Sequence, residues 1–252
     1  MNSRLKINRE NLEQIKRLPD REAHLWFVSL LLPPAKFPRF ESILSPDEAE
    51  RASRFRNVTP KLRYIAARGW LRTLLASYVS IQPEQLRFAY NDLGKPRLAD
   101  ESAAVGFSVS HSDDCALLGF VRKHNIGVDL ERVHEDIEFD VLAKRFFLPN
   151  EFKKLQSLPA DQRLHSFYCA WTRKEAYLKA RGEGLFQGLH RIEVSLLPDE
   201  PAKILSAADD AHASRNWMMK HLSPRQGYVG AVVVDTTGIE FKYFRWEQEQ
   251  YP

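Results

Sequence analysis

Two acidic residues, two positions apart in a short apolar stretch, are the first candidates for chemistry in this sequence. The segment 126–131 alternates apolar residues with Gly127, Asp129 and Glu131. On a β-strand, residues i and i+2 point to the same face, so the two carboxylates lie about 6.5–7 Å apart along the chain. Carboxylates this close repel unless a cation lies between them, and Mg²⁺ prefers such oxygen ligands. On the pattern alone, the commoner explanation is a strand with one solvated face.

A second set of candidates recurs at helical spacing later in the chain. Trp171, Glu175 and Lys179 are four residues apart, which places them on one face of a helix, with Phe167 one turn earlier. A Glu–Lys pair at this spacing is most often a surface ion pair, but two aromatic residues on the same face indicate partial burial. A buried Glu175 that faces the strand carboxylates would complete a metal site, and Lys179 would neutralise a phosphoryl oxygen or a leaving group.

Polar residues at the end of an earlier strand pattern form a third group. Ser110 and His111 are adjacent on a strand and point to opposite faces, so they do not easily form a Ser–His catalytic pair. Together with Lys95, in the turn that runs from Gly94 to Pro96, they are more economically interpreted as phosphate contacts. A capped strand end explains Ser110 and His111 equally well.

Charge is distributed unevenly along the chain. The chain has 37 Lys and Arg residues and 33 Asp and Glu residues. In the stretch 51–72 every charged residue is basic, whereas the stretch 129–140 is strongly acidic. A polyphosphate ligand, held by arginines and by metal-bound carboxylates, fits this arrangement better than a uniform nucleic-acid surface. Two alternatives stay open: a metal-dependent nuclease that uses the acidic pair, and a nucleic-acid-binding module that uses 51–72.

Length and composition describe an ordinary globular protein. The chain has 252 residues, of which 44% are hydrophobic and 28% charged. Its two cysteines, Cys115 and Cys169, exclude a disulfide framework or a Cys-rich zinc site, and we expect both in the core. The longest near-apolar run, 25–32, is too short to span a bilayer, and charges fall where a secretory signal would be apolar. We therefore expect a cytoplasmic protein with no membrane partner.

The elements that must position these residues repeat an order of strand, helices and strands. In the first part we expect a helix start at Ser45-Pro46 and a helix over 59–78, with strands at 25–32, 86–90, 105–110 and 115–121. In the second part we expect helices at 139–147, 150–157 and 161–181, the last ended by Gly182, with strands at 126–131, 191–197, 216–222, 227–235 and 241–247. The order hints at two similar α+β halves, which divide near residue 123.

Five motifs, taken together, resemble those of the 4′-phosphopantetheinyl transferases of the Sfp type. Each motif is weak alone, but their order and spacing over about residues 45–190 are specific. They are Leu-Gly-Lys-Pro (93–96), Phe-Ser-Val-Ser-His-Ser (107–112), Ile-Gly-Val-Asp-Leu-Glu (126–131), Arg-Phe-Phe-Leu-Pro-Asn-Glu (145–151) and Trp-Thr-Arg-Lys-Glu-Ala-Tyr-Leu-Lys (171–179), followed by Gly182, Gly184 and Leu185.

The resemblance implies a fold, a reaction and partners. The fold is two similar α+β halves with the active site in the cleft between them. Residues 1–122 would contact the phosphates of coenzyme A, and residues 123–252 would bind the metal and dock the carrier protein. The reaction is the Mg²⁺-dependent transfer of 4′-phosphopantetheine from coenzyme A to a serine of an apo acyl or peptidyl carrier protein, with release of adenosine 3′,5′-bisphosphate. The expected partners include no nucleic acid, and the expected state is a monomer.

The resemblance also assigns roles to residues, motif by motif. Asp129, Glu131 and Glu175 match the metal-binding carboxylates, and Lys179 matches the lysine at the transferred phosphate. Glu151 matches a carboxylate proposed as the general base, so the proton of the carrier serine has three candidate acceptors: Glu151, Glu175 and a metal-bound water. The candidate contacts to coenzyme A are Arg56, Arg63, Gly94, Lys95, Pro96, Ser110 and His111.

The sequence departs from the family pattern at the expected 3′-phosphate clamp. Several relatives carry lysines where Asp47 and Glu50 stand here, and Leu93 replaces a frequent aromatic residue. Acids do not bind a phosphate, so we expect Arg63 and Arg56 to form the clamp instead, with His111 and Lys95 reaching in from the strand side.

A carrier dock is expected around the Glu151 motif. Basic residues flank an apolar group in this stretch, which fits an acidic helical partner. The basic residues are Lys144, Arg145, Lys153 and Lys154, and the apolar group is Phe146, Phe147, Leu148 and Phe152.

Overall fold

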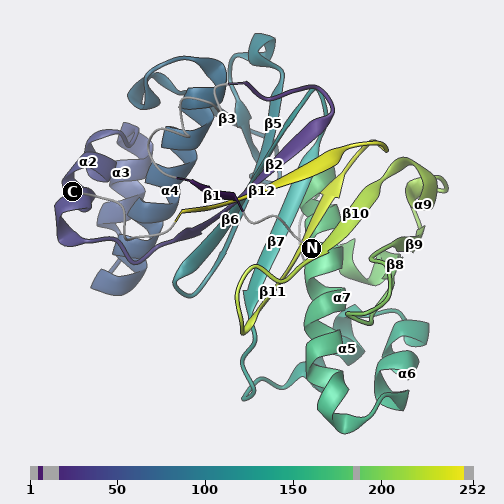
Figure 1. Ribbon diagram of the computed structural model, residues 1–252. Helices are drawn as coiled ribbons and strands as arrows, with labels where there is room; N and C mark the ends of the chain where they lie inside the picture. Colours follow the sequence, from purple (N-terminus) through teal and green to yellow (C-terminus); the bar gives the residue numbers. More distant parts are fainter. Residues whose placement is uncertain (1–4, 8–16, 184–187, 247–252) are drawn as a thin grey trace. The chain divides into compact units, whose positions relative to one another are not determined.

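The chain folds into two compact units in a computed structural model that describes residues 5–7, 17–183 and 188–246 (Figure 1). Unit 1 takes its described residues from Met1–Tyr90, Pro96–Lys123 and Glu240–Pro252, and unit 2 from Asn91–Lys95 and His124–Ile239. These units differ from the expected division after residue 122 at both 91–95 and 240–246. Both units contain a strand, two short helices, one 22-residue helix and further strands, in that order.

Unit 1 is built on a five-stranded sheet in the order β1-β12-β2-β6-β5. Its strands are β1 (Leu5–Ile7), β12 (Glu240–Trp246), β2 (Glu22–Ser29), β6 (Cys115–Arg122) and β5 (Val105–Ser112). The strand expected at 241–247 is present as β12, but it belongs to unit 1, because it pairs in parallel with β2, for example Phe244 opposite Trp26. The expected hairpin of 105–110 and 115–121 is confirmed as β5 and β6, joined by a turn in which Asp113 has φ +47°.

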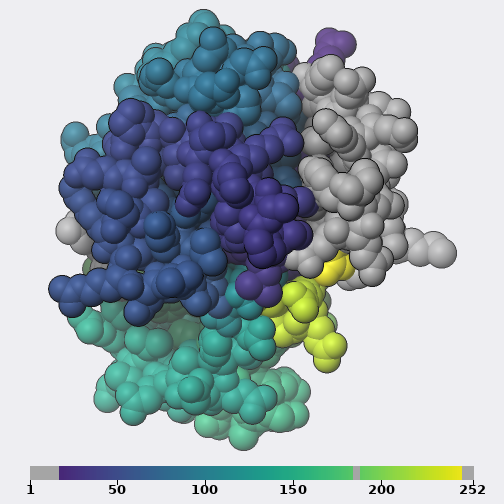
Figure 2. Space-filling model, turned by 90° about the vertical axis from the view of Figure 1, so that its left-hand side faces the viewer, coloured from purple at the N-terminus to yellow at the C-terminus, as the bar shows by residue number. Residues whose placement is uncertain are grey.

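Helices cover the sheet of unit 1. They are α2 (Phe37–Ser42), α3 (Pro46–Ser53) and α4 (Val58–Val79), and a small hairpin of β3 (Phe88–Tyr90) and β4 (Pro96–Leu98) follows. The helix start at Ser45-Pro46 is confirmed, since Ser45 and Glu48 form a capping box. The core joins α4, through Ile65 and Leu74, to sheet residues such as Trp26. Figure 2 shows the outer surface that α2, α3 and the start of α4 present, in purple to blue.

Some arginines of the cationic stretch 51–72 form ion pairs inside unit 1. Arg72 is fully buried, and its Nε donates to Glu48 Oε2 at 2.5 Å. The Nε of Arg68 donates to Glu48 Oε1 at 2.6 Å. Burial works against the charge of Glu48, but the two guanidinium groups lower its pKa. These arginines therefore stabilise the contact between α3 and α4 and are not available to a phosphate or a nucleic acid.

Unit 2 combines a three-stranded antiparallel sheet, in the order β10-β11-β7, with the long helix α7. Its elements are β7 (Ile126–Arg132), α5 (Phe139–Phe146), α6 (Pro149–Ser157), α7 (Ala160–Arg181), β8 (Ile192–Val194), β9 (Ile204–Ala207), α9 (Ala213–Asn216), β10 (Met218–Leu222) and β11 (Tyr228–Val234). The three expected helices are confirmed within two residues at each end, and Gly182 ends α7 with φ +75°. Gly184 and Leu185 of the last motif lie outside the described residues.

Two predicted strands have different limits. The first, expected at 25–32, is β2, which begins at Glu22 and ends at Ser29, opposite Cys115, the residue at which its antiparallel neighbour β6 begins. The strand expected at 191–197 is reduced to β8, where the pairing with β9 is irregular at Glu193. In the part of the chain that the structure describes, no helix is both long enough and apolar enough to cross a membrane.

Candidate active site

A glycine brings the strand β7 and the helix α7 into close contact. A Cβ atom on Gly127 would lie 1.9 Å from the carbonyl oxygen of Ala176 and 2.4 Å from the nitrogen of Ala180, both backbone atoms of α7. No side chain fits in that space. Because side chains alternate along a strand, Asp129 and Glu131 lie on the same face as Gly127, the face that α7 covers. The solvated strand face is therefore not what this structure shows, since Asp129 is 1% exposed.

Lys179 links the carboxylates of the strand and the helix. Its Nζ donates to Asp129 Oδ1 at 2.6 Å and lies 3.9 Å from Glu175 Oε2. Glu175 is buried, at 7% exposure, while Glu131 and Lys179 are partly exposed. The structure thus brings together the four residues that the strand and helix patterns single out.

The electrostatics of this cluster show an excess of negative charge. Burial, and then the charges of Asp129 and Glu131, raise the pKa of Glu175 to about 8, against the opposing effect of Lys179. Burial works against the charge of Lys179, but Asp129 and Glu175 raise its pKa. Glu175 is therefore difficult to ionise unless a further cation is present.

The donor atoms of this cluster fit a hard divalent cation. Asp129, Glu131 and Glu175 offer only carboxylate oxygens, which Mg²⁺ prefers. The three do not form a closed cage, because their ligand atoms do not all lie within 4.8 Å of one another, and Nζ of Lys179 contacts both Asp129 and Glu175. Mg²⁺ characteristically keeps several waters and takes one or two protein carboxylates with phosphate oxygens, so an open set of this kind suits it.

Glu151 has a different environment from the cluster around Lys179. It is 1% exposed, and its Oε1 accepts from the backbone of Val194 while its Oε2 accepts from the backbone of Leu148, each at 2.9 Å. Oε2 also lies 2.5 Å from Nζ of the fully buried Lys174. That ammonium donates to two backbone carbonyls as well, those of Leu189 and Ile192. Glu151 is thus a buried member of a hydrogen-bonded pair that joins α6, α7 and β8.

The candidate phosphate contacts of unit 1 lie on β5, on α4 and in the turn before α4. Ser110 is buried and His111 is exposed, as expected for neighbours on a strand. Arg63 donates through Nε and Nη2 to Asp114 Oδ1, at 3.0 and 2.6 Å, and a third of its side chain is exposed. Arg56 is exposed in the turn before α4. Arg63 is thus oriented by an acid from the β5–β6 turn.

The turn with Gly94 and Lys95 belongs to unit 2, where it caps the end of α7. Lys95 Nζ donates to the carbonyl of Ala180 at 2.8 Å, and Asn91 Nδ2 donates to the carbonyl of Gly182, also at 2.8 Å. Carbonyls at a helix C-terminus need such donors. Burial lowers the pKa of Lys95 to about 8, although Asp235 opposes the shift. Gly94 has φ +83°, a conformation that favours glycine, and Pro96 begins β4.

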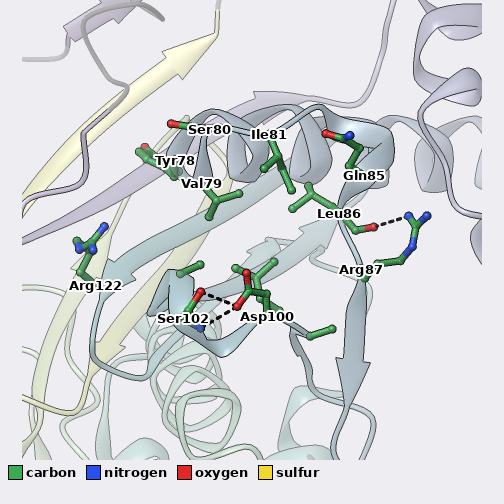
Figure 3. A pocket seen from close by; sticks show the side chains of 13 residues that line it. Tyr78, Val79, Ser80, Ile81, Gln85, Leu86, Arg87, Asp100, Ser102 and Arg122 are labelled. Carbon is green, nitrogen blue, oxygen red and sulfur yellow. Dashed lines mark hydrogen bonds between the residues drawn. The ribbon is translucent and has the colours of Figure 1, made fainter.

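A pocket of about 580 Å³ in unit 1 contains none of the expected site residues (Figure 3). It lies beside the end of α4, where Tyr78 and Ile81 contribute apolar surface. Its polar groups include Arg122 and Asp100, and Asp100 is already bonded to Ser102. The pocket is therefore separate from the motif residues.

Sequence reasoning missed several residues that hold the site together. Gly127 stands out in the sequence only as part of a motif. A glycine between strand residues is nevertheless a signal that another backbone segment approaches the strand closely. Lys174 and Asn91 gave no signal of their own, because their partners are backbone carbonyls distant in sequence. The apolar part of the expected carrier dock was wrong for two residues: Phe146 and Phe147 lie in the core, where they contact Trp171 and Phe167.

Comparisons with known proteins match both units to one family. Residues 125–233 match the model of the 4′-phosphopantetheinyl transferase superfamily, and residues 33–120 match the model of the 4′-phosphopantetheinyl transferase N-terminal domain. The chain is 39% identical to 4′-phosphopantetheinyl transferase HetI of Nostoc sp. over 89% of this chain and 92% of that protein. It is 30% identical to 4′-phosphopantetheinyl transferase Sfp of Bacillus subtilis, over 66% of this chain and 72% of that protein.

Both family models cover segments that carry the motifs, and the HetI alignment runs through both units. The family is an enzyme family, which favours a transferase over the nuclease and the nucleic-acid-binding module. This chain belongs to the 4′-phosphopantetheinyl transferase superfamily.

Proposed function

We propose that this enzyme transfers 4′-phosphopantetheine from coenzyme A to a serine hydroxyl of an apo acyl or peptidyl carrier protein, with Mg²⁺, and releases adenosine 3′,5′-bisphosphate. The observation that carries the proposal is the cluster of Asp129, Glu131 and Glu175 around Lys179, with Nζ of Lys179 2.6 Å from Asp129 Oδ1. Transfer of a phosphoryl group needs charge neutralisation and positioning more than a covalent intermediate. The attacking hydroxyl belongs to the partner, so the chain needs no nucleophile of its own.

Asp129, Glu131 and Glu175 would hold the metal ion. When bound, Mg²⁺ supplies charge neutralisation at the pyrophosphate of coenzyme A. Lys179 would bind a phosphoryl oxygen, and its raised pKa keeps the ammonium charged at neutral pH. Asp129 and Glu175 orient the Lys179 side chain for that task.

The proton of the carrier serine is better assigned to Glu175 than to Glu151. Glu175 belongs to the cluster that would meet the phosphates, and its Oε2 lies 3.9 Å from Nζ of Lys179. Both oxygens of Glu151 already accept hydrogen bonds within unit 2. A metal-bound water stays the third candidate.

Coenzyme A would be held through its phosphates by residues of unit 1, together with the turn at Gly94 and Lys95 of unit 2. Asp114 engages Nε and Nη2 of Arg63 and orients the guanidinium, so a phosphate would bind through its remaining N–H groups. The exposed Arg56 is near it in sequence. Ser110 and His111 would add a hydroxyl and an imidazole. Lys95, with Gly94 and Pro96 in the same turn, would contact a phosphate only if it gave up or shared its bond to the carbonyl of Ala180.

The carrier dock is proposed on the exposed face of α5 and the start of α6. Val141 is 59% exposed and shares a helix face with Lys144 and Arg145, at spacings of three and four residues. Lys153 is exposed on α6, while Lys154 pairs with Glu200 at 3.3 Å. This basic rim around an apolar residue fits an acidic helical partner.

One assay tests the function directly. The protein is incubated with coenzyme A, Mg²⁺ and an apo carrier domain, and the carrier is examined for the mass gain of one phosphopantetheine. Asp129→Ala should abolish the gain while the circular dichroism spectrum stays that of a folded protein. Glu101→Ala, at an exposed ion pair with Arg97, serves as the control. Transfer by Asp129→Ala at low Mg²⁺ at the wild-type rate would refute the metal assignment.

The single active site between two similar halves, the monomeric state and the cytoplasmic location remain predictions.

A further inference from the structure

Unit 2 contains a second cluster of metal-ligating side chains that the proposed reaction does not use. His165 and Cys169 are four residues apart on α7, and His221 lies on β10. One ligand atom from each of the three lies within 4.8 Å of the others, and no other such group of three occurs among the residues that the structure describes. Sγ of Cys169 is 4.0 Å from Nδ1 of His221.

The fold brings these three residues together by two independent periodicities. The spacing i, i+4 places His165 and Cys169 on the same face of α7. On β10, His221 shares a strand face with Met219, which is in the core that α7 also lines. The cluster is thus fixed by helix-on-sheet packing within unit 2, with no loop needed to close it.

The donor set selects a particular class of metal. One thiolate and two imidazoles suit a borderline or soft ion such as Zn²⁺, while Mg²⁺ requires oxygen ligands. Nε2 of His221 is 3.0 Å from the hydroxyl of Ser223, so the second ring nitrogen has a partner that orients the ring. A partner on the second nitrogen is the usual arrangement for a histidine that binds a metal.

We propose that His165, Cys169 and His221 form a binding site for one Zn²⁺ ion, with water as the fourth ligand. The ion would link α7 to the edge strand β10. Binding replaces the thiol proton of Cys169 by the metal and releases that proton to solvent, so no oxidant or reductant is needed. Since α7 also carries Glu175 and Lys179, zinc would stabilise the helix on which the transferase cluster is built.

Two charged residues lie near the cluster. Arg173 and Asp199 both act on Cys169 and on His221, with opposite charges. The guanidinium of Arg173 donates to the carbonyls of Ser195 and Leu197. Because the metal displaces the thiol proton, binding should strengthen as the pH rises from 6 to 8.

Cobalt is the probe that tests the site, because a thiolate bound to Co²⁺ gives a charge-transfer absorption band that carboxylate ligands do not give. The full chain, reduced and freed of metal by a chelator, is titrated with Co²⁺ in excess Mg²⁺ without coenzyme A. We expect one Co²⁺ per chain, the thiolate band, intense tetrahedral bands and displacement by one equivalent of Zn²⁺. Zinc at about 100 times its Kd should raise the Tm by about 5–10 °C.

Cys169→Ser should lose the band and the zinc-induced shift in Tm. Cys115→Ser is the matched control, because Cys115 is equally buried but lies in unit 1, and it should bind like the wild type. If Cys169→Ser does not fold, His165→Gln at the partly exposed end of the cluster keeps the thiolate and should weaken Co²⁺ binding at least 10-fold. The absence of a thiolate band in the wild type, its loss in Cys115→Ser, or unchanged affinity in His165→Gln would overturn the proposal.

Discussion

The ion pair of Glu151 and Lys174 allows a structural role of Glu151 to be distinguished from a role as general base. Replacing Glu151 by Gln keeps the size of the side chain but removes its charge and one acceptor oxygen. Lys174 is then a buried ammonium without its ionic partner, and breaking a buried pair in this way costs about 3–5 kcal/mol. At about 2–4 °C of Tm for each kcal/mol, we expect Glu151→Gln to melt about 6–20 °C below the wild type.

The chemical role predicts a different result. A general base contributes about 10²–10⁴-fold to the rate, so its loss would lower kcat by that factor without a comparable loss of stability. We expect instead that kcat per folded molecule, measured well below the melting range, stays within a few-fold of the wild type. The assay is transfer to a carrier domain at saturating coenzyme A, with the folded fraction measured by circular dichroism in the same buffer.

Two further variants make the test specific. Glu101→Gln, at an exposed pair with Arg97, should leave both Tm and kcat unchanged. The double variant Glu151→Gln with Lys174→Met should be less destabilised than the sum of the single variants, because it removes both buried charges together. A loss of kcat by 10² or more in Glu151→Gln, with a Tm like that of the wild type, would refute the structural assignment.

Four other variants and conditions test the rest of the proposal. The raised pKa of Glu175 favours the protonated folded state, so the Tm of the metal-free enzyme should fall as the pH rises from 5 to 8, and Glu175→Gln should flatten that slope. Mg²⁺ should therefore stabilise the wild type more at pH 8 than at pH 6. Gly127→Ala should lower the Tm and raise the Mg²⁺ concentration needed for transfer, because its Cβ collides with backbone atoms of α7; an unchanged Mg²⁺ requirement would contradict this. Arg63→Ala should raise the KM for coenzyme A about 10- to 150-fold. Dephospho-coenzyme A lacks the 3′-phosphate, so we expect the wild type to use it poorly and Arg63→Ala to use it about as well, whereas equal damage to both substrates would assign Arg63 to the fold or the pyrophosphate. Lys153→Glu should raise the KM for the carrier alone, and a rise for coenzyme A instead would move the dock elsewhere.

Local signals predicted most of the elements around the site. The alternation in 126–131 identifies β7, and the spacing of Trp171, Glu175 and Lys179 identifies one face of α7. These patterns need only the neighbouring residues, because a strand repeats every two residues and a helix every 3.6. The assignment of 241–247 to the C-terminal half was wrong because strand partners are not local: the sequence of β12 does not tell which strand it pairs with.

Burial of charge is the feature that the sequence hides most completely. Three consecutive charged residues of α7, Arg173, Lys174 and Glu175, would predict an exposed segment of the helix. All three side chains are buried. Arg173 and Lys174 donate to carbonyl oxygens of segments 15 to 24 residues further along the chain. Carbonyl groups leave no trace in a sequence, since every residue has one, and only the fold shows which of them point inward.

Charge balance then distinguishes the two buried acidic sites of unit 2. In the Glu151 pair, one carboxylate faces one ammonium, so the net charge is zero and nothing further is required. In the other site, the three carboxylates of Asp129, Glu131 and Glu175 are near the single ammonium of Lys179. When all four groups are ionised, the site has an excess of two negative charges. The protein alone relieves this excess by keeping a proton on Glu175, whose pKa rises to about 8. A divalent cation has the charge that removes the excess, and this is why the cluster around Lys179, and not the Glu151 pair, is the one that fits a metal-dependent transfer.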